Sequence, residues 1–268
     1  VKVFYPGVAS WEFLLSGDHG QGAQRVRSMQ KSCAECHVGD TGEYDIYADK
    51  IITGELEKSE SGDALEPDPI EGQPGFKEVS VQVAHDAENI YVRLSWPGAE
   101  DSIVSMQVAN QIKTFEAYGC YITCHDDQKD MPADNDQTLY AYFTHSGDKI
   151  APQPRLDSHI EKQQFMDLWL GKFEGGKVSA EDEYILEARH DDNNDLSASG
   201  SFEGGINTVV LTRKLSTGDD KDIQLSDGST FSIGIAVHDA GRESRFHHTS
   251  FPVSVGLGAG GDITSKKM

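Results

Sequence analysis

The strongest constraint on this chain is a pair of short cysteine and histidine runs that contain all four of its cysteines. The first is CAECH, from Cys33 to His37, and the second is CYITCH, from Cys120 to His125. Two thiols one turn apart can each add to a haem vinyl group, while the next histidine is carried under the iron. We therefore predict two covalently bound haem c groups, attached by Cys33, Cys36, Cys120 and Cys124, with His37 and His125 as proximal iron ligands.

The second run has three residues between its cysteines instead of two. A helix with about 3.6 residues per turn accommodates a spacing of either three or four, so a looser turn can absorb the extra residue. A four-thiolate zinc site, short-range disulfides or a thioredoxin-like pair are the alternatives. A zinc site or disulfides would leave the histidine after each pair unexplained, and the βαβ context of a thioredoxin-like pair is absent.

Covalent haem attachment in bacteria takes place outside the cytoplasmic membrane, so we expect a periplasmic protein. No apolar run of about 18 residues is present, which predicts no membrane insertion. The formal net charge of -22 argues against nucleic acid and against anionic lipid surfaces. A field of this sign can steer a basic redox partner, at a rate that falls as salt rises.

The chain is predicted to have two parts. Residues 1–60 would form a small amino-terminal haem c segment with a helix from Gly20 to about Gln30, too polar to build its own core. Residues 55–75 are charged and rich in proline and glycine, which is typical of a connector. Residues 61–268 would form a second domain, whose insertion at about 111–180 carries the second haem.

In this second part, apolar residues alternate with polar ones, which predicts strands. The candidate strands, separated by turn signals, are 79–85, 90–96, 102–110, 183–190, 206–215, 230–239 and 251–258. Many strands with few helices favour a mainly β fold, an antiparallel β-sandwich. One helix is predicted in the insertion, over residues 158–173, from the apolar spacing of Ile160, Phe165, Leu168 and Trp169.

The stretches VQVAHDAENIYVRLSW, GSFEGGINTVVLTRKL and FSIGIAVHDAGRESRFHHTSFPVSVGLG resemble the haem-binding domain of the ethylbenzene dehydrogenase and dimethylsulfide dehydrogenase γ-subunits. The likeness covers about residues 75–260. It implies a β-sandwich and an electron-transfer role beside a molybdenum enzyme. Those subunits carry one b-type haem and lack an amino-terminal CxxCH, so this chain is more similar to stand-alone dihaem c-type relatives.

Distal iron ligands must come from the remaining histidines or from Met or Lys. The γ-subunits use a lysine near the last strand, and RFHHTS at 245–250 holds the similar place here. This likeness favours His248 for the second haem, with His247 as the alternative. His19 is the nearest candidate for the first haem, with His85 as runner-up. His145 and His159 lie near the second motif and could replace His248.

Two histidine ligands on each iron would leave no open coordination position, which favours an electron carrier over an enzyme. The predicted function is therefore electron transfer between periplasmic redox proteins, other cytochromes or a molybdenum oxidoreductase among them. A tightly held subunit of such a complex, and a peroxidase-like enzyme or sensor with one open iron, are the alternatives. The run DDNND at 191–195 resembles the opening of a calcium loop, but Leu196 replaces the required glycine, so we predict a solvated turn.

Overall fold

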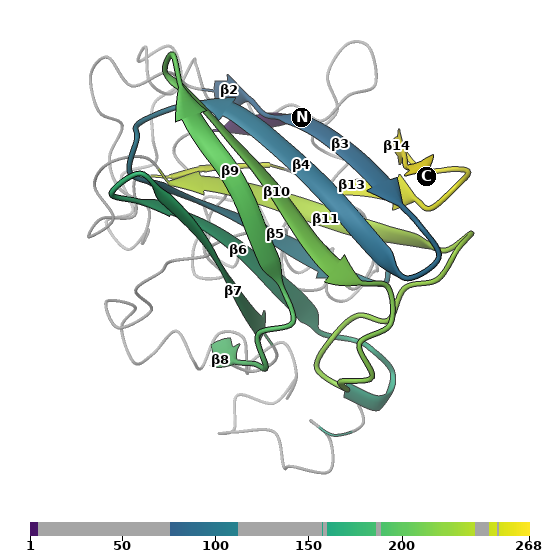
Figure 1. The fold of residues 1–268 in the computed structure, drawn as a ribbon. Helices are drawn as coiled ribbons and strands as arrows, with labels where there is room; N and C mark the ends of the chain where they lie inside the picture. Colours follow the sequence, from purple (N-terminus) through teal and green to yellow (C-terminus); the bar gives the residue numbers. More distant parts are fainter. Residues whose placement is uncertain (5–75, 112–156, 158–159, 186–188, 239–246, 251) are drawn as a thin grey trace, which may run out of the picture.

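The computed structural model describes residues 1–4, 76–111, 157, 160–185, 189–238, 247–250 and 252–268. Within these ranges the chain is built from strands, and the helical residues are 157 and 160–161. The strands form two sheets, and Figure 1 shows the smaller sheet lying across one face of the larger one. The mainly β class predicted from the alternating pattern is confirmed.

The larger sheet has the strand order β2-β1-β12-β11-β5-β6-β7-β8, and β13 joins it beside β11, followed by β14. Its neighbours are antiparallel, apart from the parallel pair β13 and β14. The strand bounds are β1 Lys2–Phe4, β2 Phe76–Glu78, β5 Ser102–Ala109, β6 Met166–Glu174, β7 Lys177–Ile185, β8 Arg189–Asp191, β11 Thr230–His238, β12 His247–Thr249, β13 Val253–Gly256 and β14 Ile263–Thr264.

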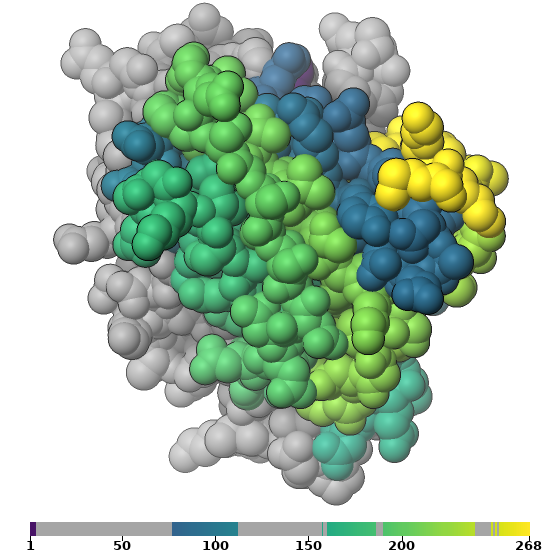
Figure 2. Space-filling view, viewed as in Figure 1, coloured from purple at the N-terminus to yellow at the C-terminus, as the bar shows by residue number. Residues whose placement is uncertain are grey.

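The smaller sheet has the order β15-β3-β4-β10-β9. Its strands are β3 Ser80–His85, β4 Asn89–Pro97, β9 Ser197–Glu203, β10 Ile206–Lys214 and β15 Lys266–Lys267. Strands β4 and β10 alternate along their length, with each buried residue between partly exposed ones. This is the pattern of strands with one face on a core and one toward water. The outer face of this sheet is turned toward the viewer in Figure 2.

The turn between β3 and β4 is the hairpin turn predicted from HDAEN. Asp86 Oδ1 accepts hydrogen bonds from the backbone N–H groups of Glu88 and Asn89, both at 2.8 Å. Its Oδ2 accepts one from the Tyr91 hydroxyl, also at 2.8 Å. These bonds hold the pKa of Asp86 well below its usual range, at about 2, because they favour the ionised carboxylate. The side chain thus closes the turn that sets the register of the hairpin.

The two sheets share one hydrophobic core. Trp96 of β4 meets Phe173 of β6 edge to face, with ring centroids 5.6 Å apart. A Cβ atom on Gly171 would lie 3.3 Å from side-chain carbons of both Val104 and Val209, which belong to opposite sheets. The glycine therefore sits where the two layers approach most closely, and a larger residue there would push them apart.

The central strands of the larger sheet are buried on both faces. One face meets the smaller sheet. On the other face lie small, apolar and polar residues that are also buried, and they are Ile103, Ser105, Gln107, Leu168, Leu170, Ser232, Gly234, Ala236 and His238. Strands buried on both faces carry continuous runs without alternation, as β5 and β11 do. The described strands supply a packing layer for the first face alone.

The helix predicted over 158–173 is wrong, because its second half, residues 166–173, belongs to strand β6. Residues 166–170 are all buried, and a short apolar run buried on both faces cannot be told from a helix by its spacing alone. A Gly-Gly pair follows, with Gly175 and Gly176 at φ of 56° and 74°, as the tight β6–β7 hairpin requires. The predicted insertion therefore contributes β6 and the start of β7 to the larger sheet.

The remaining predictions from the sequence concern individual strands, one amino-terminal helix and the domain division. Six of the predicted strands coincide with β3, β4, β5, β10, β11 and β13, while 183–190 spans the end of β7 and the start of β8. The helix predicted at 20–30 lies outside the described residues. The division into parts 1–60 and 61–268 stays a prediction. In the described ranges, no helix has the length and hydropathy needed to cross a bilayer.

Candidate functional site

The residues predicted to attach the two haems lie outside the described part of the chain, and so does His19. They are Cys33, Cys36, His37, Cys120, Cys124 and His125. The described strands place three other histidines of interest, His85, His238 and His248, and all three are buried. Their strand positions and contacts are described in turn below.

His248, the favoured distal ligand of the second haem, lies in β12 and is 1% exposed. Its backbone pairs in register with Val237 of β11, and directly opposed residues share a face of the sheet. Val237 in turn opposes Val104, which faces the core between the sheets. His248 is therefore on the side turned to the smaller sheet. The alternative, His247, pairs through its backbone with His238.

His85, the runner-up for the first haem, is fully buried at the end of β3 and is hydrogen bonded through both ring nitrogens. Nε2 lies 3.1 Å from a carboxylate oxygen of Asp227, and Nδ1 lies 2.8 Å from the Ser265 hydroxyl. Since Asp227 is held ionised, with its pKa lowered by the bonds from Lys267 and His85, Nε2 donates and Nδ1 accepts. This arrangement supports a structural role, which ties β3 to the carboxyl-terminal strands.

His238 was not among the predicted ligands. It ends β11, is 4% exposed, and opposes Ile103, which places it on the second face of the larger sheet. The sequence shows it only as part of VHDAGR, a strand-ending turn. Its burial on that face was therefore not evident before the sheet was assembled.

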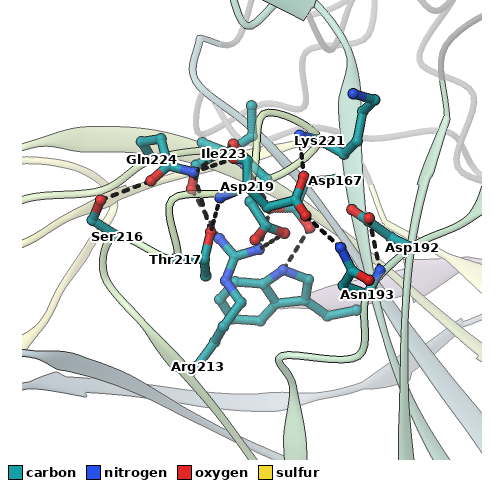
Figure 3. A network of polar contacts seen from close by, with 12 residues as sticks. Asp167, Asp192, Asn193, Arg213, Ser216, Thr217, Asp219, Lys221, Ile223 and Gln224 are labelled. Atoms are coloured by element: carbon teal, nitrogen blue, oxygen red, sulfur yellow. Dashed lines mark hydrogen bonds and ion pairs between the residues drawn. The ribbon is translucent and has the colours of Figure 1, made fainter.

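A second site that sequence reasoning missed is a buried charged cluster at the other end of the core. Arg213 of β10 is 1% exposed, and its Nη1 donates to Asp167 Oδ2 at 2.6 Å and to Asp222 Oδ1 at 2.7 Å. Its Nη2 donates to the Ile223 carbonyl at 2.8 Å. Figure 3 shows the Arg213 guanidinium with Ser216, Thr217 and Gln224 on one side and Asp192 and Asn193 on the other.

Asp167 has both carboxylate oxygens occupied. Trp169 Nε1 donates to Oδ1 at 2.7 Å, and the Ile223 backbone N–H donates to Oδ2 at 2.9 Å beside Arg213. The Arg213 guanidinium also lies 4.5 Å from the Trp169 ring centroid. Burial raises the pKa of Asp167 to about 6, although Arg213 opposes this shift. The same aspartates, in turn, raise the pKa of Arg213 despite its burial.

Asp182 of β7 completes the cluster. One oxygen from each of Asp167, Asp182 and Asp222 lies within 4.8 Å of the others, and all three residues are buried. Burial and the neighbouring Asp167 raise the pKa of Asp182 to about 9. The cluster joins residues 167, 182, 213 and 222, which only the sheet register brings together. The one available sequence signal was Arg213 at an inward position of β10, in step with Val209 and Leu211.

The two cysteine and histidine runs are of the kind that attaches haem in c-type cytochromes. No family model matches this chain. It is 30% identical over 283 residues to cytochrome c-552 of Stutzerimonas stutzeri, and the match spans all of this chain and 87% of that protein. It is 25% identical over 279 residues to cytochrome c-551 of Rhodocyclus tenuis, across 95% of that protein. The chain belongs to the c-type cytochrome family that includes cytochrome c-552.

Proposed function

We propose that this protein is a dihaem c-type cytochrome that carries electrons between periplasmic redox partners. The observation that carries the proposal is that two cysteine and histidine runs use every cysteine in the chain. Membership in the c-type cytochrome family supports covalent haem and an electron-transfer role. When bound, the haems supply the redox chemistry, and the protein supplies ligands, burial and a docking surface.

The two packed sheets support an antiparallel sandwich like that of the ethylbenzene dehydrogenase γ-subunit type. The smaller sheet covers one face of the larger sheet, yet Ser105, Gln107 and His238 on the other face are buried too.

For the distal ligands, we propose His19 and His248. Hydrogen bonds to Asp227 and Ser265 occupy both ring nitrogens of His85, which argues against His85 as an iron ligand. An iron ligand needs one ring nitrogen free of a proton and directed at the metal. His247 and His238, which are neighbours through the β11–β12 pairing, are the alternatives if His248 is not the ligand.

The haem count is tested by mass spectrometry and the pyridine haemochrome spectrum of the purified protein. We expect two haems per chain, and one in a variant with both Cys120 and Cys124 changed to alanine. A matched variant at Cys33 and Cys36 should retain the other haem. One haem in the unaltered protein, or two in either double variant, would overturn the assignment.

The carrier role is tested by electron paramagnetic resonance and by carbon monoxide binding to the reduced protein. Two low-spin signals and no carbon monoxide adduct are expected if both irons have two protein ligands. A high-spin signal with an adduct on one haem would favour the peroxidase-like or sensor function instead.

A tightly held electron-transfer subunit of a molybdenum oxidoreductase is the second candidate, and the γ-subunit likeness over residues 75–260 favours it. The two candidates differ in how they meet a partner. A mobile carrier with a net charge of -22 should exchange electrons at a rate that falls with ionic strength. Co-purification with a catalytic subunit at high salt, with no salt dependence of the rate, would favour the subunit.

A further inference from the structure

The buried carboxylates of Asp167, Asp182 and Asp222 form a group that the proposed electron-transfer function does not use. Asp167 comes from β6, Asp182 from β7, and Asp222 from the segment after β10. Their nearest oxygens all lie within 4.8 Å of one another. Three carboxylates this close and this well buried repel one another unless positive charge lies among them.

Asp182 also points to a bound ligand, because neither of its oxygens has a hydrogen-bond partner within the described part of the chain. The residue is 3% exposed, and both oxygens are inaccessible to water. An ionised carboxylate buried without a partner is strongly destabilising. Because one of these oxygens belongs to the carboxylate cluster, a cation bound in the cluster would supply the missing partner.

Arg213 neutralises only part of the cluster. Its Nη1 lies between Asp167 and Asp222, and its Nη2 is taken by the Ile223 carbonyl. No bond from the guanidinium reaches Asp182. When all three carboxylates are ionised, one guanidinium leaves an excess of two negative charges, which is the charge that one divalent cation would balance.

Asp192 lies at the edge of the same group. Its backbone N–H donates to the Asp182 carbonyl at 3.3 Å, and its Oδ2 is buried without a hydrogen-bond partner among the described residues. Its other oxygen accepts from the Asn193 N–H at 2.7 Å. Asp192 therefore adds to the negative charge around Asp182.

We propose that this cluster binds one calcium ion, held by Asp182, Asp167 and Asp222. An all-oxygen, carboxylate-rich donor set suits a hard cation and not a soft transition metal. Calcium takes oxygen ligands at about 2.3–2.6 Å in flexible geometry, so two ligands across the ion are separated by about 5 Å at most. The 4.8 Å limit on the oxygen separations fits that sphere. Magnesium, which retains several waters in an octahedral shell, suits this buried cluster less well.

This site differs from the calcium-loop pattern weighed for 191–195. Asp191, Asn193, Asn194 and Asp195 are exposed, and Leu196 is buried in the core, so that run is the predicted solvated turn apart from Asp192. The ion would instead join β6 and β7 of the larger sheet to the segment that follows β10 of the smaller one. It would therefore act as a cross-link between the two layers of the core.

Calorimetric titration of the dihaem protein, stripped of metal with a chelator, tests the site. CaCl₂ titrated through the millimolar range should bind at one site per chain, and MgCl₂ should bind more weakly. Saturating calcium should raise the Tm by several degrees, because the ion binds the folded state alone. Asp182→Asn, which retains the side-chain shape and removes the charge, should abolish both the binding and the Tm shift.

The matched control is Asp101→Asn, at an exposed aspartate just before β5 whose Oδ1 accepts a hydrogen bond from the Gly175 N–H, which an asparagine oxygen can also accept. It lies about 20 Å along the strand direction from the cluster, and it removes the same charge. Calcium binding to this variant should equal that of the unaltered protein.

The measurements on the unaltered protein test the proposal even if Asp182→Asn fails to fold. Absence of both calorimetric binding and a Tm shift in that protein would overturn it. Calcium binding to a folded Asp182→Asn variant, with unchanged haem content and circular dichroism, would also overturn it, because the ion would then bind elsewhere. Equal Tm shifts with magnesium and calcium would contradict the choice of cation.

Discussion

Arg213 of the smaller sheet donates a hydrogen bond to Asp167 of the larger sheet at 2.6 Å, with both side chains fully buried. This hydrogen bond joins the two sheets within a core that is otherwise mostly hydrophobic. Trp169 Nε1 and the Ile223 backbone N–H also donate to Asp167. The pair therefore fixes the lateral position of one sheet over the other, which apolar packing alone leaves less sharply defined.

Replacing Arg213 by methionine should destabilise the fold strongly. The side chain is similar in length, but its loss leaves Asp167 and Asp222 buried without their guanidinium. Breaking a buried ion pair in this way lowers the free energy of unfolding by about 3–5 kcal/mol. Urea denaturation followed by circular dichroism measures the change. Arg213→Lys keeps the positive charge but loses the planar guanidinium with its several donors, so the free energy of unfolding should fall by less than in Arg213→Met. Equal stability of Arg213→Met and the unaltered protein would show that the pair is not structural.

Stability in calcium-free buffer should fall as the pH rises through the neutral range. The pKa of Asp182 rises from 3.8 to about 9 on folding, so the folded protein binds a proton that the unfolded chain releases near pH 4. The free energy of unfolding therefore decreases between these two pH values and is highest below the lower one. Denaturant titrations from pH 5 to pH 8 measure the slope. Asp182→Asn should flatten it and be more stable than the unaltered protein at pH 8; an unchanged slope would contradict the assignment.

His85 and His248 should give different results when they are removed. His85→Ala breaks the bonds to Asp227 and Ser265, so it should lower the Tm while leaving the haem spectra unchanged. His248→Ala should convert one haem to a high-spin, carbon monoxide-binding form, if His248 is its distal ligand. Optical and paramagnetic resonance spectra at matched haem content compare the two. A spectral change in the His85 variant alone would reverse the ligand assignment.

Removing the Asp86 side chain should weaken the β3–β4 hairpin. Asp86→Ala loses three accepted hydrogen bonds, from Glu88, Asn89 and Tyr91, and should lower the Tm. Asp86→Asn keeps one carbonyl oxygen for the backbone donors and serves as the control. Because the folded pKa is lowered to about 2, the contribution of this carboxylate is present above its ordinary pKa and is lost as the pH falls toward 2. A Tm difference between the alanine variant and the unaltered protein that persists undiminished at pH 2 would argue against this role.

The strands could be predicted from the sequence where one face of the strand is buried and the other faces solvent. Val92 and Leu94 alternate with polar residues in β4, and the pattern gave the strand directly. The prediction failed in β6, where residues on both faces are buried and the period-two signal disappears. A better signal was present nearby. The run Phe-Glu-Gly-Gly occurs at 173–176 and again at 202–205, and each copy makes a tight hairpin with both glycines at positive φ.

The sequence by itself determined the covalent chemistry and the mainly β class. The proposed haem attachment depends on residues that are adjacent along the chain, in CAECH and CYITCH. A half-buried strand likewise shows its period of two in neighbouring positions. Only the tertiary structure decided that Asp167, Asp182, Arg213 and Asp222 meet in one buried cluster, or that His85 is held by Asp227 and Ser265. Those contacts join residues up to 180 positions apart, and they depend on strand register and burial, which the local sequence does not encode.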